Sequence, residues 1–141
     1  MTAASWASSP AIRATMRGNR SRDTAPELAL RSALHRRGLR FRVDRAPLPG
    51  LRRRADVVFG PTRVAVFVHG CFWHGCPEHY IAPRANREFW KAKVEGNRAR
   101  DADTGRLLTE AGWEVVVVWE HDNAEVAADR IAMLVSDRRA K

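Results

Sequence analysis

The sequence predicts an α/β fold in which helices cover the faces of a sheet. Short apolar runs typical of strands alternate along the chain with amphipathic stretches typical of helices. The 141 residues suit a single domain, and apolar residues make up 45% of them, as in folded proteins. We find no internal repeat and no linker, so the elements should form one unit.

The first element should be a helix that follows a basic arm. Residues 1–23 carry four arginines and few apolar anchors, which predicts a flexible arm before one domain at 24–141. Thr24 and Glu27 have the spacing of a capping box, so a helix should begin there and stop at Gly38. Capping would be a sufficient role for Glu27, although it could also be an acid at a catalytic site.

The later elements are predicted from apolar runs and from the turn residues between them. They are a strand at 40–43, strands at 55–59 and 63–68, a helix from 86 to 95 that continues toward 110, a strand at 114–119 and a helix at 125–135. The run at 114–119 is almost purely apolar, which is typical of a buried central strand. We expect it to lie beside the strand at 63–68.

The charge balance favours a nucleic-acid partner. The chain has 25 Lys and Arg against 16 Asp and Glu, a net charge of +9 and a pI near 11.1. A polyanion rewards such an excess through counterion release, although a general richness in arginine would produce it too. No apolar run approaches the roughly 20 residues of a membrane helix, and no signal-peptide core is seen. We therefore expect a cytoplasmic protein that binds no membrane.

A cluster of cysteines and histidines follows the strand at 63–68. Cys71, Cys76 and His79 are spaced to wrap one zinc ion, and His121 could supply the fourth ligand from the end of the 114–119 strand. Four such ligands leave no open position, so the zinc would be structural. The alternative is a pair of reduced, buried thiols beside unrelated histidines.

One acid lies inside an apolar strand, where an ionised group is costly unless it is paired or bound to a metal. This acid is Asp56, and a salt bridge to Arg53 or Arg54 would be one explanation. The other is catalysis, since His69 and His74 follow the neighbouring strand and could approach it. A carboxylate that binds Mg²⁺ and an imidazole that takes a proton from water would together hydrolyse a phosphodiester.

The aromatic residues divide into two groups. Trp113 and Trp119 flank the apolar strand and are expected in the core. Phe72 and Trp73 lie instead between the predicted zinc ligands, where planar rings could wedge between base pairs, although they could also belong to the core. Trp90 and Met16 could assist them.

The segment Phe67-Val68-His69-Gly70-Cys71-Phe72-Trp73-His74 closely resembles the very short patch repair (Vsr-type) DNA mismatch endonucleases. Further matches occur in the family's order over about residues 12 to 122. They are Met16-Arg17, Thr24-x-x-Glu27, Leu48-Pro49-Gly50, Ala55-Asp56, Phe89-Trp90, Asn97, Arg100-Asp101, Gly112-Trp113 and Val118-Trp119-Glu120. A match of this length and order is far more specific than any single motif.

The resemblance implies a restriction-endonuclease-like central mixed sheet flanked by helices, with a structural zinc site. Enzymes of this family nick one strand of double-stranded DNA beside the thymine of a T:G mismatch, the product of 5-methylcytosine deamination. The chain would do so as a monomer, with Mg²⁺ as its catalytic cofactor and Zn²⁺ as its structural one. Other repair proteins would be further partners.

The resemblance also implies roles for individual residues. Asp56 would bind Mg²⁺ with help from the carbonyl of Val68, and His74 would be the general base. His69 would support the scissile phosphate, and Glu27 would be a further acid nearby. The residues that contact DNA would be Phe72, Trp73 and Trp90, which intercalate, and Met16 and Arg17, which lie on the N-terminal arm.

The chain departs from the family at some of these positions. The family usually has Thr where this chain has Val68, so only a backbone contact would survive unchanged. The cysteine and histidine ligands are exchanged at Cys76, His79 and His121, although four ligands remain. Two other functions stay open: a zinc-stabilised DNA-binding module without cleavage, and a nuclease of the same fold with a different DNA substrate.

Overall fold

The computed structural model describes residues 24–70 and 85–140. The predicted N-terminal arm, residues 1–23, lies outside these ranges, as do residues 71–84. The described elements are α2 (Ala25–Arg36), β1 (Arg42–Arg45), β2 (Ala55–Phe59), β3 (Val64–His69), α4 (Arg87–Glu110), β4 (Glu114–Trp119) and α5 (Ala124–Arg139). The predicted order of elements is confirmed, and α4 continues through Gly96 and Gly105 although glycine disfavours a helix.

The four described strands form one mixed sheet in the order β1-β2-β3-β4. β1, β2 and β3 pair antiparallel, whereas β3 and β4 run parallel, with His69 opposite Trp119. The predicted pairing of the 114–119 run with the 63–68 run is therefore confirmed. Its predicted central position is wrong, because β4 is an edge strand of the described sheet. The apolar run of β4 is explained by the helices that pack on the two faces of the sheet, and not by a neighbouring strand at each edge.

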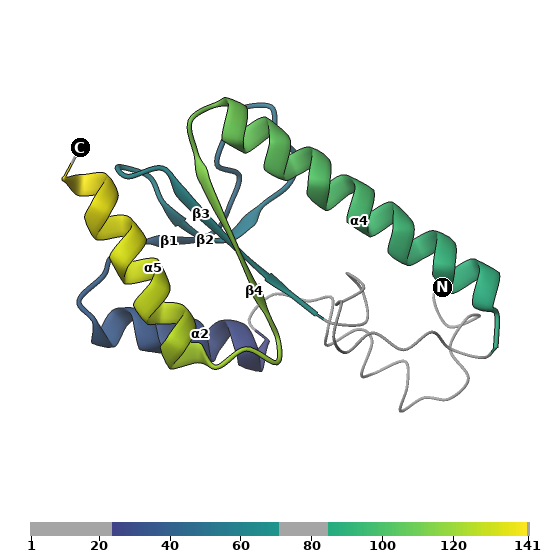
Figure 1. Cartoon of the computed structure of the whole chain (residues 1–141), viewed down its shortest axis with the longest axis horizontal. Helices are drawn as coiled ribbons and strands as arrows, with labels where there is room; N and C mark the ends of the chain where they lie inside the picture. The colour runs from purple at the N-terminus through teal and green to yellow at the C-terminus, as the bar shows by residue number, and fades with distance from the viewer. Residues whose placement is uncertain (1–23, 71–84, 141) are drawn as a thin grey trace.

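Helices cover both faces of the sheet (Figure 1). α2 and α5 lie side by side on one face, where Leu34 and Ile131 pack with the strand residues Val57, Val66 and Val118. α4 covers the other face through Leu108, and its N-terminal half extends beyond the sheet. None of the described helices has the combination of length and apolar character that would span a membrane.

The ends of α2 differ in part from the predicted ones. The helix stops as expected, since Gly38 adopts a left-handed φ of 77° that favours glycine. At the start, however, the Thr24 side chain accepts no backbone hydrogen bond, so the predicted capping box does not form. The Thr24 hydroxyl donates instead to the Glu27 carboxylate over 2.9 Å. The side chains of Thr24 and Arg31 therefore hold the Glu27 carboxylate at the helix start.

We predict that Ile131→Ala destabilises the fold by about 2–5 kcal/mol, because this fully buried side chain joins α5 to the sheet. Urea unfolding followed by circular dichroism would measure the change. The matched control is Val126→Ala on the same helix, whose side chain is 67% exposed, and it should alter stability by less than about 0.5 kcal/mol. Equal losses in the two variants would contradict this packing of α5.

Candidate active site

Asp56 lies near the start of β2, where the pairing of β2 with β3 ends. The last paired residues of the two strands are Val57 and Val66. Beyond that point the Asp56 carboxylate takes the place of a backbone acceptor, and the Val68 N–H donates to it over 2.6 Å. The Asp56 carboxylate is therefore held against the end of β3 by a backbone hydrogen bond, rather than projecting freely into water.

The surroundings of Asp56 disfavour its charged form. Burial is the largest effect and raises the pKa of this carboxyl from 3.8 to about 6, while the hydrogen bond from Val68 lowers it. Glu27 of α2 and Asp44 of β1 raise the pKa further by repulsion, and Arg31 of α2 opposes them. The structure thus brings two of the predicted acids, Asp56 and Glu27, into one electrostatic environment.

The predicted alternative for Asp56, a salt bridge to a neighbouring arginine, does not occur among the described residues. Arg53 pairs with Asp101 at 3.6 Å, and Arg54 pairs with Asp44 at 3.4 Å. Neither arginine therefore pairs with the Asp56 carboxylate itself, although Arg54 pairs with its acidic neighbour Asp44. A cation at this position would relieve the repulsion, and carboxylate oxygens are ligands that Mg²⁺ accepts.

The backbone of Val68 also faces Asp56. The carbonyl of the next residue, His69, accepts a hydrogen bond from Glu120 on the β4 side over 2.9 Å. Successive residues of a strand direct their backbone groups to opposite edges, so those of Val68 point toward β2. The Val68 carbonyl therefore lies on the same edge as the Asp56 carboxylate, which fits the predicted pair of oxygen ligands.

His69 ends β3 and is 7% exposed. Its Nδ1 lies 4.0 Å from a carboxylate oxygen of Asp101 on α4, an ion-pair distance rather than a hydrogen bond. Its ring packs edge-on against Trp119 of β4, with 5.3 Å between ring centroids. These contacts place the imidazole between α4 and the sheet.

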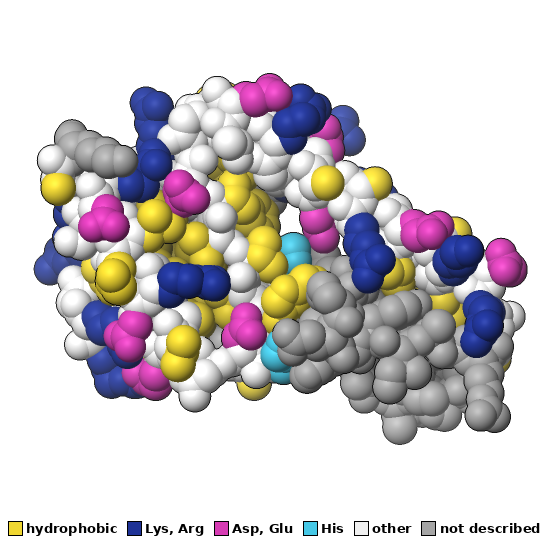
Figure 2. Space-filling view, in the orientation of Figure 1, with side chains coloured by type: hydrophobic (Ala, Val, Ile, Leu, Met, Phe, Trp, Pro, Cys, Tyr) yellow, Lys and Arg dark blue, Asp and Glu magenta, His cyan; other side chains and the backbone are white. Residues whose placement is uncertain are grey.

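A small hollow of about 40 Å³ adjoins His69 between α4 and the sheet. Figure 2 shows it as a gap bordered by a histidine and an acidic side chain. Its walls include Arg53, Asp101 and Thr104 beside apolar strand residues. This volume would hold one or two water molecules but no nucleotide.

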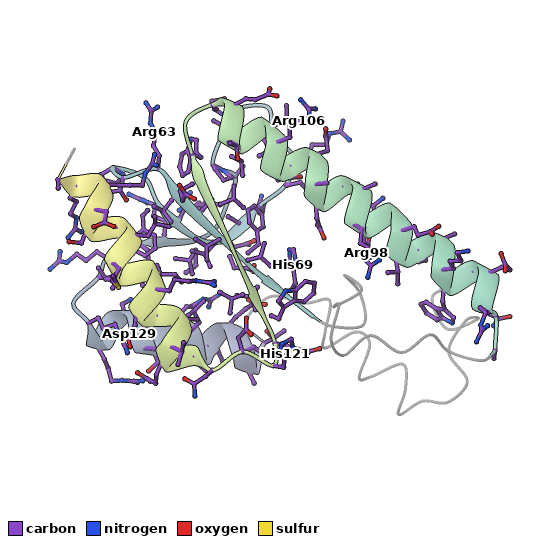
Figure 3. All side chains as sticks on the ribbon, in the orientation of Figure 1. Arg63, His69, Arg98, Arg106, His121 and Asp129 are labelled. Carbon is purple, nitrogen blue, oxygen red and sulfur yellow. The ribbon has the colours of Figure 1, made fainter. Side chains whose placement is uncertain are left out.

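His121 lies close to the point where the described chain stops after β3. Figure 3 shows His69 and His121 at the same end of the sheet, because β3 and β4 run parallel and end together. The described residues contain no group of three side chains that could hold a metal. The other predicted zinc ligands, Cys71, Cys76 and His79, lie outside the described residues, so the zinc site stays a prediction.

Among the residues predicted to contact DNA, only Trp90 is described. It is 4% exposed and packs edge-on against Phe89, which is 42% exposed. In this conformation the Trp90 ring could not enter a base stack without a rearrangement around it. Met16, Arg17, Phe72 and Trp73 lie outside the described residues, as does the predicted base His74.

Sequence reasoning assigned no role to Asp101, which contacts both His69 and Arg53. Asp101 was noted only within the family match Arg100-Asp101, and its neighbours Arg98 and Asp103 are also charged, so its role was not apparent. A signal was present in its separation from Thr104 and Leu108 by three and seven residues. That spacing places Asp101 on the helix face that packs on the sheet.

Comparison with known proteins identifies relatives over most of the chain. Residues 8–79 match the family model described as DNA mismatch endonuclease Vsr. The type II nicking enzyme V.NaeI of Lentzea aerocolonigenes is 43% identical over 122 residues, which cover 85% of this chain and 72% of the relative. The nicking enzyme V.XorIIP of Xanthomonas oryzae is 44% identical over 111 residues, 77% of this chain and 79% of the relative. The DNA mismatch endonuclease Vsr of Escherichia coli is 43% identical over 109 residues, 74% of this chain and 66% of the relative.

We predict that Asp56→Asn stabilises the metal-free protein at neutral pH by up to about 3 kcal/mol. Because the pKa of Asp56 is raised on folding to about 6, folding favours its protonated form, and its ionisation costs stability as the pH rises. The gain should therefore be absent below about pH 4 and complete above about pH 6. Denaturant unfolding at a series of pH values would measure it.

The same unfolding measurements with added Mg²⁺ provide the control. The cation should raise the stability of the wild type at pH 7.5 and leave that of Asp56→Asn unchanged, because the variant lacks the carboxylate. A variant that is less stable than the wild type at every pH would contradict the assignment of a strained, buried acid.

Proposed function

Because this chain belongs to the Vsr family of DNA mismatch endonucleases, we propose that it nicks one strand of double-stranded DNA beside a T:G mismatch, with Mg²⁺ as cofactor. The mismatch would arise by deamination of 5-methylcytosine, and the nick would begin very short patch repair. The observation that carries the proposal is the partly buried Asp56 carboxylate, held against Val68 and close to a second acid.

The donor set around Asp56 fits Mg²⁺. Asp56, Glu27 and the carbonyl of Val68 offer hard oxygen atoms, and two of the three groups are anionic. Bound Mg²⁺ would supply a positive charge that stabilises the phosphate during displacement. In this chain Val68 replaces the family's usual threonine, and a carbonyl ligand does not depend on that side chain.

The histidines would move the proton and hold the phosphate. His74 would accept a proton from the attacking water, which an imidazole can do near neutral pH. His69 would donate to the scissile phosphate. Its packing against Trp119 and its ion pair with Asp101 support this proposal, because both restrict the ring to one orientation.

Recognition of the mismatch would depend on residues of the N-terminal arm and of the segment after β3. Phe72 and Trp73 would insert beside the mispair, where unstacking costs least, and Met16 would enter from the other side. Arg17 would contact the DNA backbone. Trp90 would also intercalate, after its surroundings rearrange on binding. A closed zinc site of Cys71, Cys76, His79 and His121 would hold the inserting loop.

The net charge of +9 supports this partner, since DNA binding releases counterions from a strongly cationic protein. We further propose that the enzyme acts as a monomer in the cytoplasm, where chromosomal mismatches would be its targets. Other repair proteins would follow at the nick.

The test is a nicking assay with end-labelled duplexes that contain T:G, C:G, other mismatches or modified cytosines in varied flanking sequences. We expect Mg²⁺-dependent nicking of the thymine strand at T:G, lost in Asp56→Ala although DNA binding remains. Tight binding without any cut by the wild type would favour the DNA-binding module. Cutting of a different duplex would retain the nuclease and overturn the repair role.

We predict that Asp101→Asn lowers the kcat for nicking roughly tenfold with little change in the affinity for DNA, because Asp101 positions His69 and does not contact the substrate. Single-turnover kinetics and fluorescence anisotropy would separate the two effects. Asp103→Asn is the matched control, since this exposed acid lies on the same helix and pairs with Arg106. A similar loss of rate in both variants, or none in Asp101→Asn, would refute the positioning role.

A further inference from the structure

A groove of about 510 Å³ lies along β1, beside the candidate active site. It is lined by Val43, Asp44, Arg45, Ala46 and Arg54, and we call it the β1 groove. Both arginines are exposed. Among the described residues, the lining contains no aromatic ring and no amide side chain, the groups that commonly stack on bases or read their edges.

The β1 groove opens at the same end of β2 as Asp56. Arg45 lies opposite Ala55 in the register of β1 and β2, and Arg54 precedes Ala55 in the chain. Asp44, which also lines the groove, is close enough to raise the pKa of Asp56 by repulsion. A DNA strand whose phosphate lies at Asp56 would therefore pass the groove with its neighbouring phosphates.

Arg54 is oriented across the groove by Asp44. Its Nη1 lies 3.4 Å from both the backbone carbonyl and the carboxylate of Asp44. Asp44 itself adopts a left-handed φ of 53°, which aspartate tolerates better than most residues do. Both contacts are long and use Nη1, so in the described part of the chain the remaining donors of this guanidinium face no acceptor.

We propose that the β1 groove binds backbone phosphates of the DNA strand that passes Asp56, with Arg45 and Arg54 as the neutralising cations. The inference rests on the proposed function and assigns a ligand to Arg54, whereas the preceding residue, Arg53, pairs with Asp101. Guanidinium groups stay charged and match a phosphate with two parallel donors. Contacts of this kind add affinity and register but no base preference.

The test is the salt dependence of DNA binding, measured by fluorescence anisotropy with one T:G duplex without Mg²⁺. In Arg45→Ala/Arg54→Ala, the slope of log Kd against log salt concentration should fall by about 2, because two phosphates are no longer neutralised. The loss should be the same for a C:G duplex. Arg45→Lys/Arg54→Lys keeps the charge and should retain the slope.

The matched control is Arg63→Ala/Arg139→Ala, which removes the same charge from exposed positions. Arg63 lies at the opposite end of β3 from His69 (Figure 3), and the control should leave the slope unchanged. A slope that falls equally in both double variants, or in neither, would overturn the proposal. If the alanine double variant fails to fold, the single variant Arg54→Ala, expected to lower the slope by about 1, decides the same question.

Nicking by the wild type separates this proposal from the one before it. A wild type that cuts no duplex in Mg²⁺ would overturn the proposed function, whereas its salt slope would still test whether the β1 groove binds DNA. A wild type that nicks T:G duplexes, together with an unchanged slope in Arg45→Ala/Arg54→Ala, would overturn the groove alone.

Discussion

β3 pairs with a strand on each side, and the candidate site depends on both pairings. Toward β2 the ladder stops before Val68, whose N–H is left to the Asp56 carboxylate. Toward β4 the ladder continues to the last residue, so His69 lies against Trp119 and the chain leaves β3 beside His121. One strand therefore positions the Asp56 carboxylate on its β2 side and the His69 ring on its β4 side.

This arrangement retains an acid at a cost in stability. A core strand would gain from an apolar residue at position 56, since burial and the charges of Glu27 and Asp44 all oppose ionisation. A bound cation would relieve this repulsion, so the same surroundings that destabilise the metal-free carboxylate would favour binding of the metal. Glu27 contributes to this repulsion. Its contacts with Thr24 and Arg31 hold its carboxylate in place, and its negative charge raises the pKa of Asp56.

The strands and helices were largely predictable, because valine runs, Gly38 and the Gly60-Pro61-Thr62 turn act locally. The edge position of β4 was not, since an apolar run reports buried faces and carries no information about neighbours in the sheet. Asp56 was identified because a charge within an apolar run is conspicuous. The role of Asp101 was missed because its partner is distant in sequence and because other charged residues surround it in the helix.

The central claim is that Asp56 is a metal ligand, so that protonation of its carboxylate competes with binding of Mg²⁺. Calorimetric titration of Mg²⁺ into the protein, in two buffers of different ionisation enthalpy, measures the protons released on binding. With the pKa of Asp56 near 6, binding should release about half a proton at pH 6 and almost none at pH 8, and Asp56→Asn should release none. Equal release at the two pH values, or undiminished release from Asp56→Asn, would contradict the account.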